Sequence, residues 1–580
     1  MYSKTEVRRT TEFIRVENLP RRTWDEASAT ELAARLRPYL ATPQGTMNLR
    51  PIQAQALYEA GTYGGAFLPI RVGGGKTLLS LLLPYVMQLE RPILLIPAAL
   101  KEKTERARDK LSQHWRIPVA KLRIESYEQL SHPSSQHMLD FYRPDGIITD
   151  ESHKLKNPTA AVSKRVARYM RFYPATKFVA MSGTITKRSL RDYAHLVAWA
   201  LKDNTPLPFP YNELQEWALA LDETKDFQRL HPGALMSFAL PEDETEDDTC
   251  TARKGMRRRL TETPGVVTTT EAFSGCPIYI STVIVEKTTP TLEGYISKLR
   301  EVAETPDGWP LSDAMSLWRH AREISLGFYY RWNPRPPPEW LYARKAWCAS
   351  IRKILKTNRR NWDSEFHVSK GVIENNKEYQ QEFEEYQVWK KIEPVFEPHT
   401  EAVWFDDTVP QMAATWLRKH KHGIVWVQHT TVGEKIAQLS GCPFFSRDGR
   451  DALGRTFYDV EENPQGYKGP CVASIQSNAT GRNLQWWNQN YVVGLPSSGA
   501  TCEQLLGRTH RDLQAADEVT FEVLVACIEH YDGILRAVQD ARYIEDSTGQ
   551  SQKLLYADIT LPERDLITKL PTKRYQTTRK

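Results

Sequence analysis

The chain has 580 residues, which at roughly 150 residues per domain predicts three to four domains. Hydrophobic residues make up 41% and charged residues 26%, which excludes wholesale disorder, and no apolar run approaches the roughly 18 residues of a membrane span. The 77 Lys and Arg against 71 Asp and Glu give a net charge of +6, an excess compatible with a polyanionic partner. Seven cysteines without a CxxC pair favour neither a zinc site nor a disulfide framework. We therefore expect a cytoplasmic protein with no membrane partner.

Short apolar runs of strand length alternate with helical patterns in two regions, residues 41–204 and 401–545. The runs in the first region are 66–70, 93–96, 146–149 and 178–181. Those in the second region are 424–427, 472–475, 491–493 and 519–525. Because strands that alternate with helices are typical of parallel sheets covered on both faces, the sequence predicts an α/β protein with two such domains.

The segments outside these regions have a different character. Residues 205–400 contain an acidic run at 242–248, then basic residues, and then helix-like stretches in which Trp, Tyr and Arg are interleaved. We predict a mostly helical insert here, an N-terminal extension over 1–40 and a basic C-terminal tail over 546–580. Aromatic residues at helical spacing fit a hydrophobic core, whereas the basic side chains fit a nucleic-acid path, and the sequence leaves both interpretations open.

The sharpest local motif is Arg-Val-Gly-Gly-Gly-Lys-Thr, which runs from Arg71 to Thr77 between an apolar run and a helical pattern. Three glycines form its centre: Gly73, Gly74 and Gly75. Glycines let successive backbone N–H groups face one anion, and a helix N-terminus adds its positive end. Lys76 would reach the β- and γ-phosphates, and Thr77 would bind Mg²⁺. The alternative is an ordinary glycine-rich turn, since the strict pattern asks for Gly where Ile70 stands.

Two carboxylates, Asp150 and Glu151, follow an apolar strand of the first region. The carboxyl ends of parallel strands form the ligand crevice, so both side chains are expected beside the phosphate loop. Asp150 suits Mg²⁺ coordination through water, and Glu151 suits deprotonation of an attacking water. A helix cap is the alternative for this acid pair, but the phosphate loop upstream favours catalysis.

Several motifs in order resemble those of superfamily 2 helicases and translocases, and most closely the Swi/Snf-type branch. Asn-Leu-Arg-Pro-Ile-Gln, with Arg50 and Gln53, is similar to the element that reads adenine. Asp-Glu-Ser-His-Lys-Leu-Lys-Asn, starting at Asp150, is similar to Asp-Glu-Ala-His-Arg-Leu-Lys-Asn. The resemblance implies that four residues couple hydrolysis to domain movement: His153, Ser182, Gly183 and Thr184.

In the second region, Gln-Leu-Leu-Gly-Arg-Thr-His-Arg from Gln504 to Arg511 resembles Gln-x-x-Gly-Arg-x-x-Arg. The resemblance implies that Arg508 and Arg511 act as an arginine finger and that Gly481 and Gln504 belong to the nucleotide site. Ser-Asn-Ala at 477–479 replaces the usual Ala-Gly-Gly. The implied nucleic-acid contacts are Pro97, Ser126, Tyr127, Gln428, Ser474, Gln476 and Asn483.

The resemblance implies two RecA-like domains that bind ATP and Mg²⁺ between them. It implies an ATP-dependent helicase or translocase acting on duplex, forked or branched DNA, with protein partners through the insert. The compact form resembles phage or bacterial members, which would work in the host cytoplasm or nucleoid. Two alternatives stay open: a motor of the same class on RNA or a nucleoprotein complex, and a non-catalytic, nucleotide-gated nucleic-acid-binding subunit.

Overall fold

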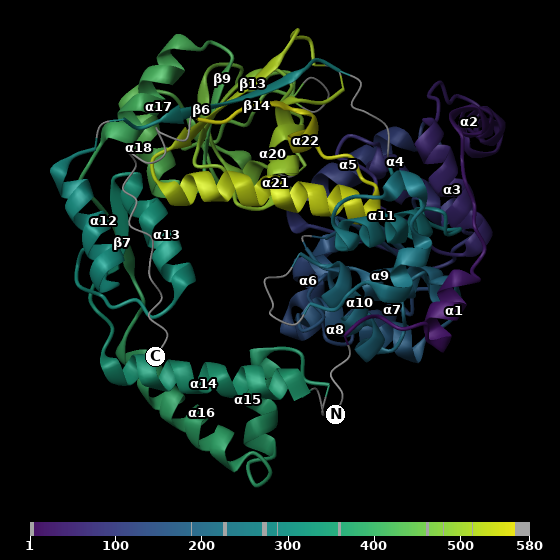
Figure 1. Ribbon diagram of the computed structural model, residues 1–580, viewed down its shortest axis with the longest axis horizontal. Helices are drawn as coiled ribbons and strands as arrows, with labels where there is room; N and C mark the ends of the chain where they lie inside the picture. Colours follow the sequence, from purple (N-terminus) through teal and green to yellow (C-terminus); the bar gives the residue numbers. More distant parts are fainter. Residues whose placement is uncertain are drawn as a thin grey trace. The chain divides into compact units, whose positions relative to one another are not determined.

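The computed structural model describes residues 5–186, 188–223, 229–269, 275–286, 288–357, 361–459, 463–479, 481–512 and 514–562. The most basic part of the predicted tail, from Leu566 onward, lies outside these residues. The chain divides into two units (Figure 1). Unit 1 comprises residues 1–272, 348–383 and 540–552, and unit 2 comprises 273–347, 384–539 and 553–580. Three of the divisions fall within helices: α14 (Pro338–Thr357), α16 (Gln380–Ile392) and α21 (Ile528–Thr548).

Unit 1 contains a five-stranded parallel sheet in the order β1-β5-β4-β2-β3. Its strands are β1 (Ala66–Leu68), β2 (Pro92–Ile96), β3 (Arg123–Ser126), β4 (Gly146–Asp150) and β5 (Lys177–Met181). All four apolar runs predicted in the first region are strands of this sheet, which confirms them. Strand β3 lies at the edge, and it escaped prediction because Ile124 is its only apolar residue.

Alternate residues of these strands enter two separate hydrophobic cores. Phe67, Ile93, Leu95, Ile147 and Phe178 belong to one core. Ala66, Leu68, Leu94, Ile148 and Val179 belong to the other. Because successive strand side chains point to opposite faces, this division shows that the sheet is covered on both sides.

The helices of unit 1 precede, connect or follow these strands, and all but α15 (Glu365–Glu374) place side chains in or against the two cores. They are α1 (Thr11–Glu17), α2 (Glu26–Leu40), α3 (Pro51–Tyr63), α4 (Lys76–Val86), α5 (Lys101–Leu111), α6 (Tyr127–Ser131), α7 (Met138–Tyr142), α8 (Ala161–Phe172), α9 (Ala194–Leu201), α10 (Tyr211–Leu221), α11 (Asp248–Thr261) and α15 (Glu365–Glu374). Helix α4 is apolar almost all round, with the buried run Leu78–Pro84, as expected for a helix enclosed by its neighbours.

Unit 2 contains a seven-stranded parallel sheet in the order β10-β11-β9-β12-β13-β6-β14. Its strands are β6 (Ile278–Ile284), β9 (Gly423–Val427), β10 (Phe444–Phe445), β11 (Cys471–Ser474), β12 (Gln489–Val493), β13 (Val519–Val525) and β14 (Asp558–Thr560). The four runs predicted in the second region are β9, β11, β12 and β13, which confirms a second parallel α/β sheet. In Figure 1, β13, β6 and β14 lie side by side at one end of this sheet.

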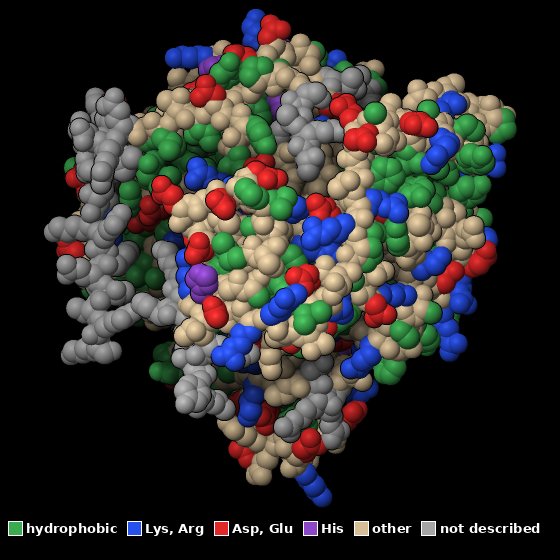
Figure 2. Space-filling view, turned by 45° about the vertical axis from the view of Figure 1, so that its right-hand side comes forward, with side chains coloured by type: hydrophobic (Ala, Val, Ile, Leu, Met, Phe, Trp, Pro, Cys, Tyr) green, Lys and Arg blue, Asp and Glu red, His purple; other side chains and the backbone are tan. Residues whose placement is uncertain are grey.

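The remaining elements of unit 2 are helices and one antiparallel pair of strands. The helices are α12 (Pro290–Val302), α13 (Ala314–Ser325), α17 (Thr408–Lys419), α18 (Thr430–Ser440), α19 (Ile475–Asn478), α20 (Gly499–Thr509) and α22 (Lys553–Tyr556). Strands β7 (Phe328–Trp332) and β8 (Thr400–Trp404) pair antiparallel outside the main sheet. On the face shown in Figure 2, Lys and Arg side chains are intermixed with Asp and Glu.

The predicted domain boundaries differ from this division. Strand β6, inside the predicted insert, pairs with β13 from Ile278–Val519 to Ile284–Val525, and β14 of the predicted tail pairs with β6. Residues up to 272 and from 348 to 383 belong to unit 1 instead of a separate insert. The backbone N–H and C=O groups of β6 are paired with strands more than 200 positions away in the sequence. A local sequence pattern cannot predict such a pairing.

Candidate functional site

The glycine-rich loop has a backbone that only glycine adopts without strain. Gly73 and Gly75 have φ values of 90° and 77°. A Cβ on Gly74 would lie 2.4 Å from Cγ2 of Ile70, and one on Gly75 would lie 2.2 Å from Nε2 of Gln53. Helix α4 begins at Lys76, directly after the loop, so the N–H groups of its first turn adjoin the loop. This is the arrangement that binds phosphate groups.

Two residues of the motif that resembles the adenine-reading element, Arg50 and Gln53, lie against this loop. The Arg50 guanidinium donates from Nη1 to the carbonyl oxygen of Gly73 (2.9 Å). The Gln53 side chain donates from Nε2 to the carbonyl oxygen of Gly75 (3.2 Å) and accepts from the Arg50 N–H at Oε1 (2.9 Å). The structure therefore brings the start of helix α3 and the predicted phosphate loop into one site.

Lys76 is held within the loop that precedes it. Its Nζ donates to the carbonyl oxygens of Ile70 and Arg71, at 3.1 Å each. The residue is 9% exposed, so the Lys76 ammonium group is enclosed by the loop and largely shielded from water. A Cβ added to Gly183 would lie 3.4 Å from Lys76 Nζ, which places the Ser182–Thr184 segment beside this cation.

Asp150 and Glu151 occupy the carboxyl end of β4, in the middle of the sheet. Burial, and secondly the charge of Glu151, raise the pKa of Asp150 to about 6, against the opposing effect of Lys76. Glu151 has a φ of 54°, a left-handed backbone that is unusual for a residue with a side chain. Such strain is concentrated at functional sites, where the surrounding structure maintains it.

The predicted coupling residues surround the Glu151 carboxylate. Its Oε2 lies 3.2 Å from Nδ1 of His153 and accepts a long hydrogen bond from Oγ of Ser182 (3.4 Å). His153 Nδ1 also lies 3.1 Å from Ser182 Oγ, and the Thr184 N–H donates to that oxygen (3.1 Å). The end of β4 and the segment after β5 are thus joined through side chains.

One residue of this site was missed by the sequence analysis. Gln550 donates from Nε2 to the carbonyl oxygen of Gly183 (2.5 Å), and both residues belong to unit 1. The neighbouring Thr268 hydroxyl donates to the carbonyl oxygen of Thr548 (3.1 Å). No local motif marks Gln550, because its partner is 367 positions away.

The nucleic-acid contacts predicted in unit 1 follow the carboxyl ends of β2 and β3. Pro97 precedes a short 3-10 helix, and Ser126 accepts the Gln129 N–H at the start of α6 (2.9 Å). Tyr127 is buried, and its hydroxyl donates to the carbonyl oxygen of Asp150 (2.7 Å). Tyr127, which follows β3, therefore contacts the backbone of Asp150 at the end of β4, with β2 between the two strands. Its ring does not face solvent.

In unit 2 the two predicted finger arginines converge on one loop. Arg508 is buried and donates to the carbonyl oxygens of Gln504 (2.8 Å) and Arg482 (2.9 Å). Arg511 donates to the carbonyl oxygen of Arg482 (3.2 Å) and to Oδ1 of Asn483. Gly481, with a φ of 76°, precedes this loop. The two motifs of the second region, far apart in sequence, thus form one cluster.

The other predicted contacts of unit 2 lie at carboxyl ends of its strands. Gln428 follows β9 and donates from Nε2 to the carbonyl oxygen of Gly494 (2.6 Å). Ser474 is the buried last residue of β11, and Gln476 lies exposed in the short helix α19. These ends form the edge at which ligands bind in open α/β sheets.

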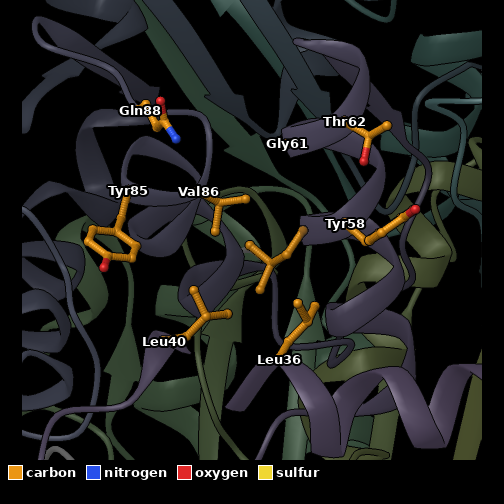
Figure 3. Close-up of a pocket in the computed structure, with 9 residues that line it drawn as sticks. Leu36, Leu40, Tyr58, Gly61, Thr62, Tyr85, Val86 and Gln88 are labelled. Carbon is orange, nitrogen blue, oxygen red and sulfur yellow. The ribbon is translucent and has the colours of Figure 1, made fainter. Parts of the chain in front are cut away.

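A separate pocket of about 430 Å³ lies between α2, α3 and α4. Figure 3 shows Leu36, Leu40 and Val86 around its middle, with Tyr58 and Tyr85 on opposite sides. Its lining contains none of the predicted site residues and no acidic or basic side chain. It therefore has no evident part in phosphate chemistry.

The sequence matches no model of a known protein family, and no curated protein matches it significantly. Within the described residues, no helix is long and apolar enough to cross a membrane. What the fold and site define is the class: an α/β protein with two parallel sheets, the first of which carries a glycine-rich loop beside two acids.

Proposed function

We propose that the protein is an ATP-dependent DNA helicase or translocase in which two RecA-like domains hydrolyse ATP to move along DNA or remodel it. The observation that carries the proposal is the first site itself. A strained glycine loop, a buried lysine and an acid pair on the central strand lie in one unit. This combination is the one that phosphoryl transfer requires.

The roles follow from the chemistry of each group. The loop N–H groups and Lys76 would bind the phosphates of ATP, with Arg50 and Gln53 at the base. Glu151 would orient and deprotonate the attacking water. Thr77 and Asp150 offer oxygen atoms suited to Mg²⁺, which when bound neutralises charge on the phosphates. Asp150 would act through water, in its ionised form.

The contacts around Glu151 support a coupling role for His153 and Ser182. A change in the hydrogen bonds of the Glu151 carboxylate would pass to the Ser182–Thr184 segment, because these groups share partners. Arg508 and Arg511 would stabilise the charge that develops on the γ-phosphate, as an arginine finger does. Motion between open and closed states would follow the nucleotide cycle.

The decisive test is the steady-state ATPase rate without effector and with single-stranded DNA, duplex DNA, forked DNA and RNA. Lys76→Ala serves as the blank, because it removes the buried cation. We expect strong stimulation by one form of DNA. Stimulation by RNA alone would assign the motor to another track, and equal low rates with every effector would contradict a nucleic-acid-dependent ATPase.

A second variant separates a motor from a nucleotide-gated binding subunit. Glu151→Gln keeps the size of the side chain but removes the proposed base. We expect it to bind ATP while hydrolysis falls by roughly 10²–10⁴-fold. If the wild type binds ATP and hydrolyses it no faster than Glu151→Gln, the chain is a binding subunit.

A further inference from the structure

Two neighbouring pockets lie in unit 2 beside the β7–β8 pair, and they share one tryptophan. The first, of about 550 Å³, lies among α13, the loop before it and the two strands. The second, also of about 550 Å³, lies against the start of α14. Trp309 lines both. Each volume is within the range of sites that bind small ligands or single nucleotides.

The first pocket contains a buried acceptor without a hydrogen-bonding partner. Glu323 is 3% exposed, and its Oε2 has no hydrogen bond. His320 Nδ1, 3.2 Å away, has none either. A buried polar atom left unpaired is costly, so this carboxylate is suited to a ligand that brings N–H donors.

The other acids of this pocket are already occupied within the chain. Asp313 caps helix α13 by accepting from the Ser316 N–H (2.8 Å) and hydroxyl (2.7 Å). Asp307 accepts from the Thr305 hydroxyl (2.5 Å) and pairs with Arg335. Glu323 lies in ion-pair range of His320 and Arg319, but its Oε2 accepts no hydrogen bond, and that oxygen is the acceptor in this pocket which a ligand could use.

Aromatic rings form much of both linings. Tyr330 and Trp332 join Trp309 in the first pocket, and Tyr342, which is 76% exposed, lines the second. Trp332 is fixed from behind by ring contact with Trp340 (centroids 6.4 Å apart). The interleaved aromatics of the predicted insert thus divide into two groups, since Trp340 itself is buried as core.

Basic side chains accompany these rings. Arg319 and Arg331 line the first pocket, Arg335 and Lys345 the second. Arg319 pairs with Glu323 and Arg335 with Asp307, but their side chains are 63% and 57% exposed, so each still presents N–H groups to a charged polymer in solvent. Rings that stack on bases, combined with cations that contact phosphates, are typical of single-strand binding.

We propose that these two pockets bind adjacent bases of a single-stranded nucleic acid. Trp309 stacks between the bases, and Glu323 accepts from the exocyclic amino group of the base in the first pocket. Adenine, cytosine and guanine carry such a group, whereas thymine and uracil do not. The choice of a nucleic acid as the polymer rests on the proposed motor function, while the pockets are independent of the ATP site.

The test is equilibrium binding of the full chain, without ATP, to labelled single-stranded oligo-dC and oligo-dT, measured by fluorescence anisotropy. We expect the wild type to bind oligo-dC about tenfold more tightly, and Glu323→Leu, which keeps the bulk but removes the acceptor, to lose this preference. Trp309→Ala should weaken binding of both strands about tenfold, because it removes a stacking surface. Tyr211→Ala, an exposed aromatic on α10 of unit 1, is the control and should bind as the wild type does.

Circular dichroism and thermal melting establish whether each variant is folded, and Trp309→Ala still tests the proposal if Glu323→Leu does not fold. Equal binding by the wild type and Trp309→Ala, with no preference for oligo-dC, would overturn the proposal. If single strands bind in the expected pattern but no nucleic acid stimulates ATP hydrolysis, the proposed motor function is wrong and the proposed binding of bases in the two pockets is supported. If a nucleic acid stimulates ATP hydrolysis and Trp309→Ala binds single strands as the wild type does, the proposed motor function is supported and the proposed binding of bases in the two pockets is wrong.

Discussion

Gln550 donates a hydrogen bond to the carbonyl oxygen of Gly183, which lies beside Lys76. The final segment of unit 1, residues 540–552, therefore contacts the segment that also joins Glu151 through Ser182. The carbonyl group is buried, so its hydrogen-bonding partner is required for the site to keep its shape.

Gln550→Leu should destabilise unit 1 by about 1–3 kcal/mol, because it leaves the Gly183 carbonyl oxygen buried without its donor. The measurement is the midpoint of thermal or denaturant unfolding. Gln411→Leu, on the exposed surface of α17, is the matched control and should change stability by less than about 0.5 kcal/mol. Equal midpoints for the two variants would show that the Gln550 hydrogen bond does not contribute to the free energy of unfolding.

Gly75→Ala should abolish nucleotide binding, because the new Cβ would displace Gln53 and strain a left-handed backbone. Gly441→Ala is the matched control, since Gly441 has a φ of 73° and no atom within 4 Å of an added Cβ. Gly441→Ala should lose about 1 kcal/mol of stability through its left-handed backbone, Gly75→Ala should lose more because Gln53 must move, and only Gly75→Ala should lose affinity for a fluorescent ATP analogue. Unchanged affinity in Gly75→Ala would contradict the assignment of the loop.

Asp150 predicts a specific dependence of stability on pH. Its pKa is raised to about 6, so the folded protein holds a proton that the unfolded chain releases near pH 4. The contribution of Asp150 to stability is then fully present below about pH 4 and is lost as pH rises through about 6. Asp150→Asn should remove this fall, measured as unfolding midpoints between pH 4 and 7. Asp109→Asn, exposed on α5, should keep it.

Arg508 and Arg511, the two arginines proposed to act as the finger, should respond differently to truncation. Arg508 is buried on the carbonyl oxygens of Gln504 and Arg482, so Arg508→Ala should lower stability by about 1–3 kcal/mol. Arg511 is less buried, and Arg511→Ala should lower kcat by roughly 10³-fold with little change in melting temperature. Wild-type turnover by folded Arg511→Ala would remove this residue from the catalytic proposal.

The sequence predicted the parts of the fold that local patterns encode. The apolar runs of β2, β4 and β9 and the glycine loop are contiguous, so their residues identify them without tertiary context. Strand β6 was missed because its sequence, Ile-Tyr-Ile-Ser-Thr-Val-Ile, lies in a segment otherwise dominated by helices. Only its pairing with β13 gives it a place in the sheet.

The candidate site shows the same limit. Lys76, Asp150 and Glu151 were identified from spacing and residue type, and the structure places them together in unit 1. The basic residues that follow the acidic run were read as part of an insert, yet Arg253 and Arg259 are buried in unit 1. Arg253 donates to the Leu221 carbonyl oxygen and Arg259 to that of Val16, and charge alone reveals neither contact.

The return of residues 540–552 to unit 1 has a consequence for how the protein is made. A ribosome synthesises residues 1–272 long before it reaches Tyr543 and Gln550. The buried Asp222 carboxylate must therefore wait for the Tyr543 hydroxyl, which donates a hydrogen bond to it in the folded protein. The intervening stretch of roughly 270 residues takes on the order of 15–50 s to translate. During that time the nascent first unit lacks every partner in residues 540–552, including Tyr543 and Gln550. The site proposed to bind nucleotide therefore reaches its final form only after residues 540–552 have been synthesised, and a chain that stops before them would carry the glycine-rich loop without its completed surroundings.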